Sequence, residues 1–460
     1  MKRLFLVVAI AAVASTASAR APREISDGVS EASLRAVVER LVSFGTRHTL
    51  SSQADPKRGI GAALRWSDSE LRAYSHACGG CLTIATPSDV VTGTRVPTPT
   101  RVSDVIAVQR GTKDPERVVI IAGHIDSRVS DVMNATSDAP GANDDGSGSA
   151  AVIEAARVLS RHKFPATIVY ALLSGEEQGL LGGKVLADYA RAQRWQVMAM
   201  LNNDIIGNSC DSDGLRDAGH VRVFSEGTRA DATPELIAAQ RSRGGENDSP
   251  SRNLSRFVDG LADELGLGLD VRPIWRSDRF GRGGDHLPML EAGFPAIRFT
   301  VAVENYDAQH QDLRTRDGVA YGDTIERMDF PYLTKVARLN VAALAALASA
   351  PRVPAPTAEG AVERDTTLSW SPIAAAARYR ISWRPTDAAA WTNSEIVPGG
   401  VTRHVLKGIR VDDWIFGVSA ISADEYETPV ASAVPGGEFG SLPQVSPARR
   451  EGTKPQPPRH

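Results

Sequence analysis

Apolar and polar residues alternate with two different periods along the first three quarters of the chain. One period is helical: in residues 30–43 the apolar side chains recur every three or four positions, on one face. The other is a short run of consecutive apolar residues, as in a buried strand. We expect strands at 104–109, 117–122, 167–173 and 197–201, and further helices at 62–76, 147–161 and 179–192. This alternation predicts an α/β fold with a mixed, mostly parallel central sheet flanked by helices.

The pattern becomes irregular between Asn208 and Asn253, where the composition is polar and rich in Gly, Asp and Arg. We expect long surface loops there, with one short strand near residues 221–224. The alternation then resumes with a helix at 254–265, strands at 271–275 and 296–301, and a closing helix at 332–349. Residues 20–350 are therefore predicted to form one α/β domain.

A second, smaller domain follows the Pro-rich linker at 351–357. Short alternating strands separated by Gly, Pro and Asp turns predict a small C-terminal β-sandwich over residues 358–436, similar to a fibronectin type III module. Its expected core consists of Leu368, Trp370, Tyr379, Ile381, Trp383, Leu406, Phe416 and Val418. Residues 437–460 are rich in Pro, Arg and Gly and are predicted to form a disordered tail.

The chain begins with the pattern of a secretory signal peptide. Lys2 and Arg3 precede a short apolar run, and Ala17-Ser18-Ala19 fits a small-residue cleavage site. The run is shorter than the ~20 apolar residues of a membrane span. We therefore predict a signal peptide at 1–19 and an exported protein, periplasmic or secreted, with no membrane span.

Charge and cysteine content narrow the possible partners. The chain has 52 basic and 55 acidic residues, and no basic block that would indicate nucleic acid as a partner. No second Cys pair exists to complete a zinc ribbon with Cys78 and Cys81, so in an exported protein a disulfide between them is favoured. Cys210 is then a free thiol. No oligomeric state follows from the sequence.

Five residues of metal-ligand type follow strand-like runs or lie in Gly-rich turns. They are His124, Asp144, Glu177, Asp204 and His310. Two imidazoles and three carboxylates suit two divalent cations that share one bridging carboxylate. For the last position His286 is a rival of His310, and spacing alone favours neither.

Neighbouring residues suggest supporting roles and also simpler alternatives. Asp126 lies two positions after His124 in an extended segment, so its side chain points the same way and can orient the imidazole. Asp144 lies in a Gly-flanked turn in which Asp145 or Ser147 caps the following helix. Of the adjacent Glu176 and Glu177, one can bind metal while the other acts as general base; alternatively the pair is a solvated helix start.

Several motifs together resemble the M28 (aminopeptidase Y-like) family of zinc peptidases. The resemblance covers residues 104–346, and Phe44-Gly45-Thr46-Arg47 extends it toward the N-terminus. The motifs are Gly123-His124-Ile125-Asp126, Gly141-Ala142-Asn143-Asp144-Asp145-Gly146, Gly175-Glu176-Glu177-Gln178-Gly179, Asn203-Asp204, Gly284-Asp285-His286-Leu287-Pro288 and Phe294-Pro295-Ala296-Ile297.

The resemblance implies a role for each candidate residue. His124 and Asp204 would hold one zinc, Glu177 and His310 the other, and Asp144 would bridge them. Glu176 would be the general base and Asp126 would orient His124. The family pattern also selects His310 over His286 as the last ligand, and it implies a cis peptide between Asp144 and Asp145.

Two positions depart from the family pattern. Gly183 stands where the family often has Ser, and Gln309 precedes His310 where an aromatic residue is common. The second departure leaves stabilisation of the transition state unassigned, with Tyr306 as a nearby candidate.

The expected function is that of an exported two-zinc aminopeptidase. It would hydrolyse peptide substrates that have a free N-terminus, through a zinc-bound hydroxide with Glu176 as general base. A carboxypeptidase or dipeptidase of the same family is the main alternative. A glutaminyl cyclase, which shares the fold but uses one zinc, is a further one, and for residues 358–436 a binding module is the remaining possibility.

Overall fold

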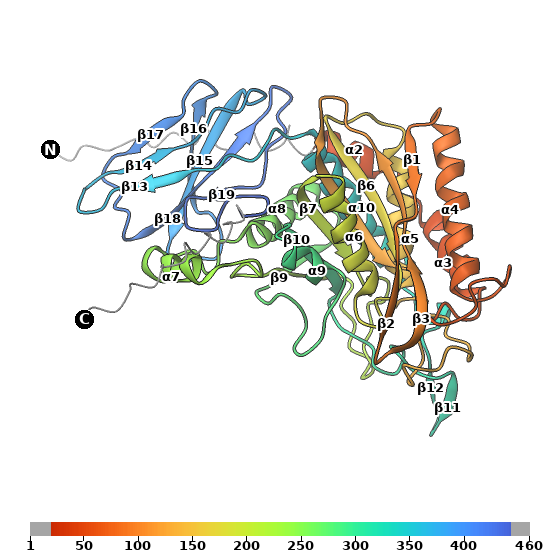
Figure 1. Ribbon diagram of the computed structural model, residues 1–460. Coiled ribbons are helices and arrows are strands. Elements are labelled where there is room, and N and C mark those ends of the chain that lie inside the picture. Colours follow the sequence, from red (N-terminus) through yellow and green to blue (C-terminus); the bar gives the residue numbers. More distant parts are fainter. Residues whose placement is uncertain (1–19, 443–460) are drawn as a thin grey trace, which may run out of the picture.

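The computed structural model describes residues 20–442, which form an α/β domain followed by a smaller β domain (Figure 1). The predicted signal peptide and the tail beyond residue 442 lie outside the described residues. No helix among residues 20–442 combines the length and the hydropathy that a membrane crossing requires.

An eight-stranded mixed sheet forms the centre of the α/β domain. Its spatial order is β1 (Leu82–Ala85), β4 (Val105–Gln109), β6 (Ala166–Leu173), β5 (Asp114–His124), β7 (Gln196–Asn203), β10 (Ala296–Val301), β8 (His220–Phe224) and β9 (Asp270–Ile274). Strands β6, β5, β7 and β10 run parallel to one another, as do β8 and β9. The pairs β1–β4, β4–β6 and β10–β8 are antiparallel. The predicted mixed, mostly parallel sheet is confirmed.

Helices cover both faces of this sheet because its central strands are apolar on both sides. In β5, Val119 and Ile121 belong to one buried cluster, whereas Val118 and Ile120 belong to another. The first cluster packs against α3 (Glu31–Val42), α4 (Ile60–Ala77), α5 (Gly146–Leu159), α8 (Pro250–Leu265) and α10 (Phe330–Ser349), and the second against α6 (Leu181–Ala192) and α9 (His286–Glu291). Helix α2 (Arg20–Ser26) lies against α10.

The segment from Asn208 to Asn253 is more helical than expected. It contains β8, as predicted, but also α7 (Pro234–Arg243) and the start of α8. Thr233 and Ser249 each cap the helix that follows, and a proline occupies the first turn of both. A capping side chain followed by proline starts a helix without any apolar periodicity. In α7 the only buried residue is Gln240, which is why the apolar pattern did not indicate it.

Two hairpins outside the central sheet were also missed by the apolar pattern. They are β2 (Ser88–Gly93) with β3 (Val96–Ser103), and β11 (Arg314–Arg316) with β12 (Val319–Tyr321). The short helix η1 (Ile325–Arg327) follows the second hairpin. Most of their side chains are exposed, so they show no alternation of buried and polar positions.

Two antiparallel sheets form the C-terminal domain. One contains β13 (Thr357–Glu359), β14 (Thr366–Ser369) and β17 (Arg403–Leu406), and the other β16 (Asn393–Pro398), β15 (Arg378–Pro385), β18 (Trp414–Ile421) and β19 (Ala431–Ser432). Residues from both sheets pack into one cluster that contains all the expected core residues, with Trp383 partly buried at its edge. The β-sandwich is confirmed; its likeness to fibronectin type III stays a prediction.

Buried polar contacts join the two domains. The carboxylate of Asp248 accepts two hydrogen bonds from Arg384, at 2.8 and 2.9 Å, and a third from Ser432. Residues 437–442, which we assigned to a disordered tail, instead lie against the α/β domain, where Arg229 donates hydrogen bonds to the carbonyl oxygens of Glu438 and Gly440.

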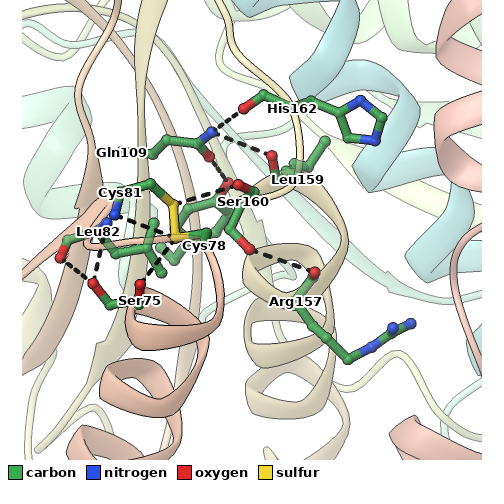
Figure 2. Close-up of a disulfide and its surroundings, with 10 residues drawn as sticks. Ser75, Cys78, Cys81, Leu82, Gln109, Arg157, Leu159, Ser160 and His162 are labelled. Carbon is green, nitrogen blue, oxygen red and sulfur yellow. Dashed lines mark hydrogen bonds between the residues drawn. A yellow bond between two sulfur atoms is a disulfide. The ribbon is translucent and has the colours of Figure 1, made fainter.

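A disulfide joins Cys78 and Cys81, as predicted, and links the end of α4 to the start of β1 (Figure 2). The hydroxyl of Ser75 donates a hydrogen bond to the carbonyl of Leu82 beside it. Cys210 is free, as expected.

Candidate active site

The predicted ligands meet at the carboxyl edge of the parallel strands. His124 is the last residue of β5, Glu177 follows β6, Asp204 follows β7, and His310 lies in the loop after β10. Asp144 lies in the turn that leads into α5. The carboxyl ends of neighbouring parallel strands are where α/β proteins bind ligands, so the fold brings together residues that are far apart in the sequence.

Asp144 occupies the middle of this group, which we call the ligand cluster (His124, Asp144, Glu177, Asp204 and His310). Its Oδ1 lies 3.1 Å from Nε2 of His124, and its Oδ2 lies 2.9 Å from Nε2 of His310. His124 Nε2 is 3.9 Å from Asp204, and His310 Nε2 is 2.9 Å from Glu177. The cluster thus consists of two sets of donor atoms, each compact enough for one metal ion, that share a single carboxylate.

The electrostatics of the ligand cluster are those of a site that can bind cations. Burial opposes protonation of His310, but Glu177 and Asp144 outweigh burial and raise its pKa to about 10. Burial likewise opposes protonation of His124, yet contacts with Asp126, Asp144 and Asp204 raise its pKa well above the usual value. Within the described residues, the buried atoms His124 Nε2 and Glu177 Oε1 make no hydrogen bond. Imidazole and carboxylate donors in this arrangement fit divalent zinc.

Asp126 connects His124 to the turn that carries Glu176 and Glu177. Its backbone carbonyl lies 3.1 Å from Nδ1 of His124, and its Oδ1 lies 3.5 Å from the same nitrogen. Its carboxylate also accepts hydrogen bonds from the backbone N–H groups of Glu176 and Glu177 and from the hydroxyl of Thr49. Asp126 is fully buried, so these contacts fix both the ring of His124 and the turn after β6.

Glu176 lies beside the cluster but makes no side-chain hydrogen bond in the described part of the chain. Burial raises its pKa well above the usual value, and the negative charge of Glu177 raises it further, while His124 acts in the opposite direction. The surroundings of its carboxyl therefore differ from those of Glu177, whose carboxylate contacts His310 and Arg128.

The turn that holds Asp144 is braced on both sides. Asp145 caps α5 by accepting a hydrogen bond from the N–H of Gly148, and its other oxygen accepts from the N–H of His124. Asp323 accepts from the N–H of Asp144. The peptide between Asp144 and Asp145 is cis, as the resemblance implied.

Buried Arg47 explains the motif that extends the resemblance toward the N-terminus. Its guanidinium donates hydrogen bonds to the carbonyl oxygens of Ile125, Pro140 and Gly141. It therefore joins the segment after His124 to the turn before Asp144.

Three non-glycine residues with positive φ lie at or near the ligands. Leu180, Ile205 and His310 all have positive φ angles, of 59°, 61° and 57°. This conformation is unfavourable for residues with a Cβ, most of all for a β-branched residue such as Ile205. Ile205 directly follows Asp204, and its N–H donates a hydrogen bond to Asp145. Strained residues of this kind persist where the surrounding structure imposes a particular geometry.

His286, the rival for the last position, lies outside the cluster. It is fully buried, and its Nε2 contacts the carbonyl oxygen of Ser277 at 2.7 Å. The structure therefore brings His310, and not His286, to Asp144.

Comparison with known proteins shows the family of this chain. The model of peptidase family M28 matches residues 104–330. A probable zinc metalloprotease of Leptosphaeria maculans is 43% identical over 413 residues, covering 89% of this chain and 95% of that protein. A second one, from Pyricularia oryzae, is 42% identical and covers 89% of this chain and 83% of its own length.

The chain belongs to peptidase family M28. It is a zinc metallopeptidase of that family, and the fold also matches solved structures. The Legionella pneumophila LapA aminopeptidase superposes with a TM-score of 0.50 at 19% identity, over 76% of this chain and 80% of that one. This likeness concerns the architecture alone.

Several residues that touch the M28 ligand cluster escaped the sequence interpretation. Arg128 donates a hydrogen bond to Glu177 at 2.9 Å and contacts Nδ1 of His310. Arg298 lies 2.8 Å from Asp204 and is fully buried. A charged residue in the middle of the otherwise apolar strand β10 was a signal that could have identified Arg298. The sequence around Arg128 contains no comparable signal, because its partners Glu177 and His310 belong to other segments.

The two departures from the family pattern have different surroundings. The side-chain amide of Gln309 donates a hydrogen bond to Oδ2 of Asp144 at 3.1 Å, so it contacts the shared carboxylate directly. At Gly183, a Cβ atom would lie 2.7 Å from the carbonyl oxygen of Asp285, which leaves no room for Ser. Tyr306, which we considered for transition-state stabilisation, is 62% exposed, and its side chain makes no hydrogen bond with the cluster within residues 20–442.

Proposed function

We propose that this M28 peptidase is an exported aminopeptidase that uses two zinc ions to remove N-terminal residues from peptides. The observation that carries the proposal is the shared carboxylate. Asp144 presents one oxygen to His124 and the other to His310, at 3.1 and 2.9 Å. Hydrolases with paired metal ions hold both ions in this way, close enough to act on one substrate bond.

When bound, two zinc ions would supply Lewis-acid polarisation of the scissile carbonyl, a lowered pKa for the attacking water and an anchor for the free α-amine. His124 and Asp204 would hold one ion, Glu177 and His310 the other, and Asp144 would bridge them. His124, Asp144, Glu177 and Asp204 are buried, whereas the side chain of His310 is 24% exposed. Burial of the four excludes bulk water and so strengthens their electrostatic effect on the substrate.

Glu176 is the proposed general base. It removes a proton from the attacking water and then donates a proton to the leaving nitrogen, as a carboxyl positioned beside the reacting atoms can do. Asp126 keeps the ring of His124 in its binding orientation and holds the backbone of Glu176. The amide of Gln309 lies close enough to Asp144 to position the shared carboxylate.

Hydrolysis of aminoacyl p-nitroanilides tests the proposal. The purified protein should release p-nitroaniline from free-amine substrates, lose this activity on chelation and regain it with zinc. N-acetylated counterparts should not react, because they have no free amine to anchor. Equal hydrolysis of acetylated and free-amine substrates would contradict the proposal.

Glu176→Gln keeps the shape of the side chain and removes its basicity. We expect kcat to fall by about 10²–10⁴-fold, the usual contribution of a general base, with zinc content unchanged. Glu39→Gln, an exposed change on α3, is the matched control. An active Glu176→Gln enzyme would assign the base elsewhere.

Carboxypeptidase or dipeptidase activity is the second candidate, because guanidinium groups lie beside Asp204 and could bind a free C-terminus. N-acetyl peptides with free C-termini belong in the same substrate panel for that reason. Cyclisation of N-terminal glutamine with release of ammonia would indicate a glutaminyl cyclase instead.

Export is tested by mass spectrometry of the mature N-terminus, which we expect to begin after Ala19.

A further inference from the structure

Arg279 is a buried arginine beside the ligand cluster whose hydrogen-bonding capacity is not filled. It lies in the loop between β9 and α9, and its side chain is 8% exposed. The guanidinium lies 4.0 Å from Asp204, and its Nε is 3.2 Å from Asp278. Nη1 lies 3.6 Å from Glu304 and makes no hydrogen bond in the described residues.

Glu304 does not fill this capacity, because its Oε2 lies 3.6 Å from Nη1, beyond hydrogen-bond distance, and is held by another arginine. Its Oε1 accepts a hydrogen bond from Arg222 at 2.6 Å, and its Oε2 accepts one from Arg282 at 2.7 Å. Burial would raise the pKa of Glu304, but Arg279, Arg222 and Arg282 lower it overall. Glu304 therefore remains a carboxylate that is shared among three guanidinium groups.

The local charge balance favours an additional anion. Arg222, Arg279, Arg282 and Arg298 face the carboxylates of Asp278, Glu304 and Asp204. When Asp204 serves as a metal ligand, two carboxylates of these ion pairs remain for four guanidinium groups, and Glu176 adds a third acidic group near Arg298. A buried guanidinium without a full set of partners is costly, and a carboxylate that binds two guanidinium groups removes this cost.

We propose that Arg279 and Arg282 form a subsite for a carboxylate of the substrate. The enzyme then prefers peptides that carry a carboxylate next to the scissile bond. Arg279 supplies the unfilled donor, and Arg282, whose side chain is 32% exposed, opens the subsite to solvent. The carboxylate belongs either to an acidic side chain or to the free C-terminus of a short peptide. The inference rests on the proposed function, which puts the scissile bond at the ligand cluster.

Matched substrate pairs that differ only in the carboxylate test the subsite. Glu-p-nitroanilide is compared with Gln-p-nitroanilide, Leu-Glu-amide with Leu-Gln-amide, and Leu-Gly with Leu-Gly-amide. We expect the acid of at least one pair to be preferred by about tenfold or more in kcat/KM, the effect of one hydrogen bond to a charged group. The first two pairs report on acidic side chains and the third on a free C-terminus.

Variants assign the preference to named residues. Arg279→Gln and Arg282→Gln should each bring the acid-to-amide ratio close to one, mainly through KM. Arg276→Gln is the control, because Arg276 is exposed on the same loop and packs over Phe280 instead. Arg282 is partly exposed, so its variant remains informative if Arg279→Gln does not fold.

Binding provides a readout that does not depend on turnover. Calorimetry with the zinc-loaded protein should show tighter binding of L-glutamate than of L-glutamine, and Arg282→Gln should remove the difference. Equal rates and equal binding for acids and amides, or a preference that survives both arginine substitutions, would overturn the subsite. Loss of all hydrolysis, including that of the neutral amides, would contradict the proposed function instead, and glutamate binding would still decide on the subsite.

Discussion

Two groups of buried polar residues in this molecule both contain carboxylates but differ in the groups that surround them. One is the ligand cluster at the carboxyl edge of the sheet. The other lies between the domains and contains Asp248, Arg384 and Ser432. There Arg384 donates two hydrogen bonds to Asp248, and Ser432 donates a third, so the carboxylate is satisfied by the protein itself.

The ligand cluster has different surroundings. Three carboxylates meet two imidazoles in two compact sets of donor atoms. Within the described chain, His124 Nε2 and Glu177 Oε1 make no hydrogen bond, and neither does Arg384 Nε between the domains. Burial of charge alone therefore does not distinguish a functional site from a structural one. What distinguishes the cluster is that two compact sets of imidazole and carboxylate donors share one carboxylate, an arrangement that divalent cations fit.

The largest expected effect comes from removing the shared charge in the ligand cluster. Asp144→Asn keeps the shape of the side chain but weakens both sets of donor atoms at once. We expect zinc to be lost and kcat/KM to fall by well over about 100-fold, more than the loss of a supporting partner causes. Metal analysis and hydrolysis of the p-nitroanilides measure this, and retention of two zinc ions with full activity would refute the shared-carboxylate interpretation.

The corresponding change between the domains should affect stability instead of zinc. Asp248→Asn removes the charge that pairs with buried Arg384 and should lower the free energy of unfolding by about 3–5 kcal/mol, as when one partner of a buried ion pair is lost. Activity per folded molecule should stay the same. Denaturant unfolding measures this, with Asp263→Asn, an exposed change on α8, as the control.

A double substitution sharpens the contrast further. Asp248→Leu with Arg384→Met removes both charges but leaves Arg256, whose guanidinium lies 3.8 Å from Asp248, so part of the lost stability should return. If the double variant is as unstable as Asp248→Asn, the pair does not act as a unit.

A moderate effect on zinc binding is expected at Asp126, which orients the ligand His124 but does not belong to the ligand cluster. Asp126→Asn should weaken zinc binding by about 10–100-fold, as is usual for partners of metal-binding histidines. Zinc titration with a competing chelator measures the affinity. Thr49→Val, which removes only the hydroxyl donated to Asp126, should have a smaller effect. Equal zinc affinity in Asp126→Asn and the unchanged protein would show that zinc binding by His124 does not depend on Asp126.

The smallest effect is expected from the disulfide, which belongs to neither group. Replacing Cys78 and Cys81 with serine opens a short loop and should cost about 2 kcal/mol or less. Zinc content and specific activity should not change. Thermal unfolding with and without a reducing agent measures the difference, and a loss of zinc on reduction would show that this end of α4 supports the site.

Much of the site could be predicted because metal chemistry restricts the residue types. Only a few side chains bind zinc, so His124, Asp144 and Glu177 were recognisable by their type and by their position after strands or in Gly-rich turns. His310 was different. The residues alone did not separate it from His286, and only the resemblance to M28 peptidases favoured it. Contacts such as those of Arg128 depend on loops whose paths the sequence pattern does not specify.

The sequence by itself determined most strands and helices of the central sheet domain and the residue types of the candidate ligands. These features depend on local composition, on periodicity and on the chemistry of single side chains. The tertiary structure decided which distant residues share a charge. Asp248 meets Arg384 across 136 positions, and Arg279 meets Asp204 and Glu304, because separate loops converge on them. Whether a buried charge is satisfied depends on everything that surrounds it, and that is known only once the chain has folded.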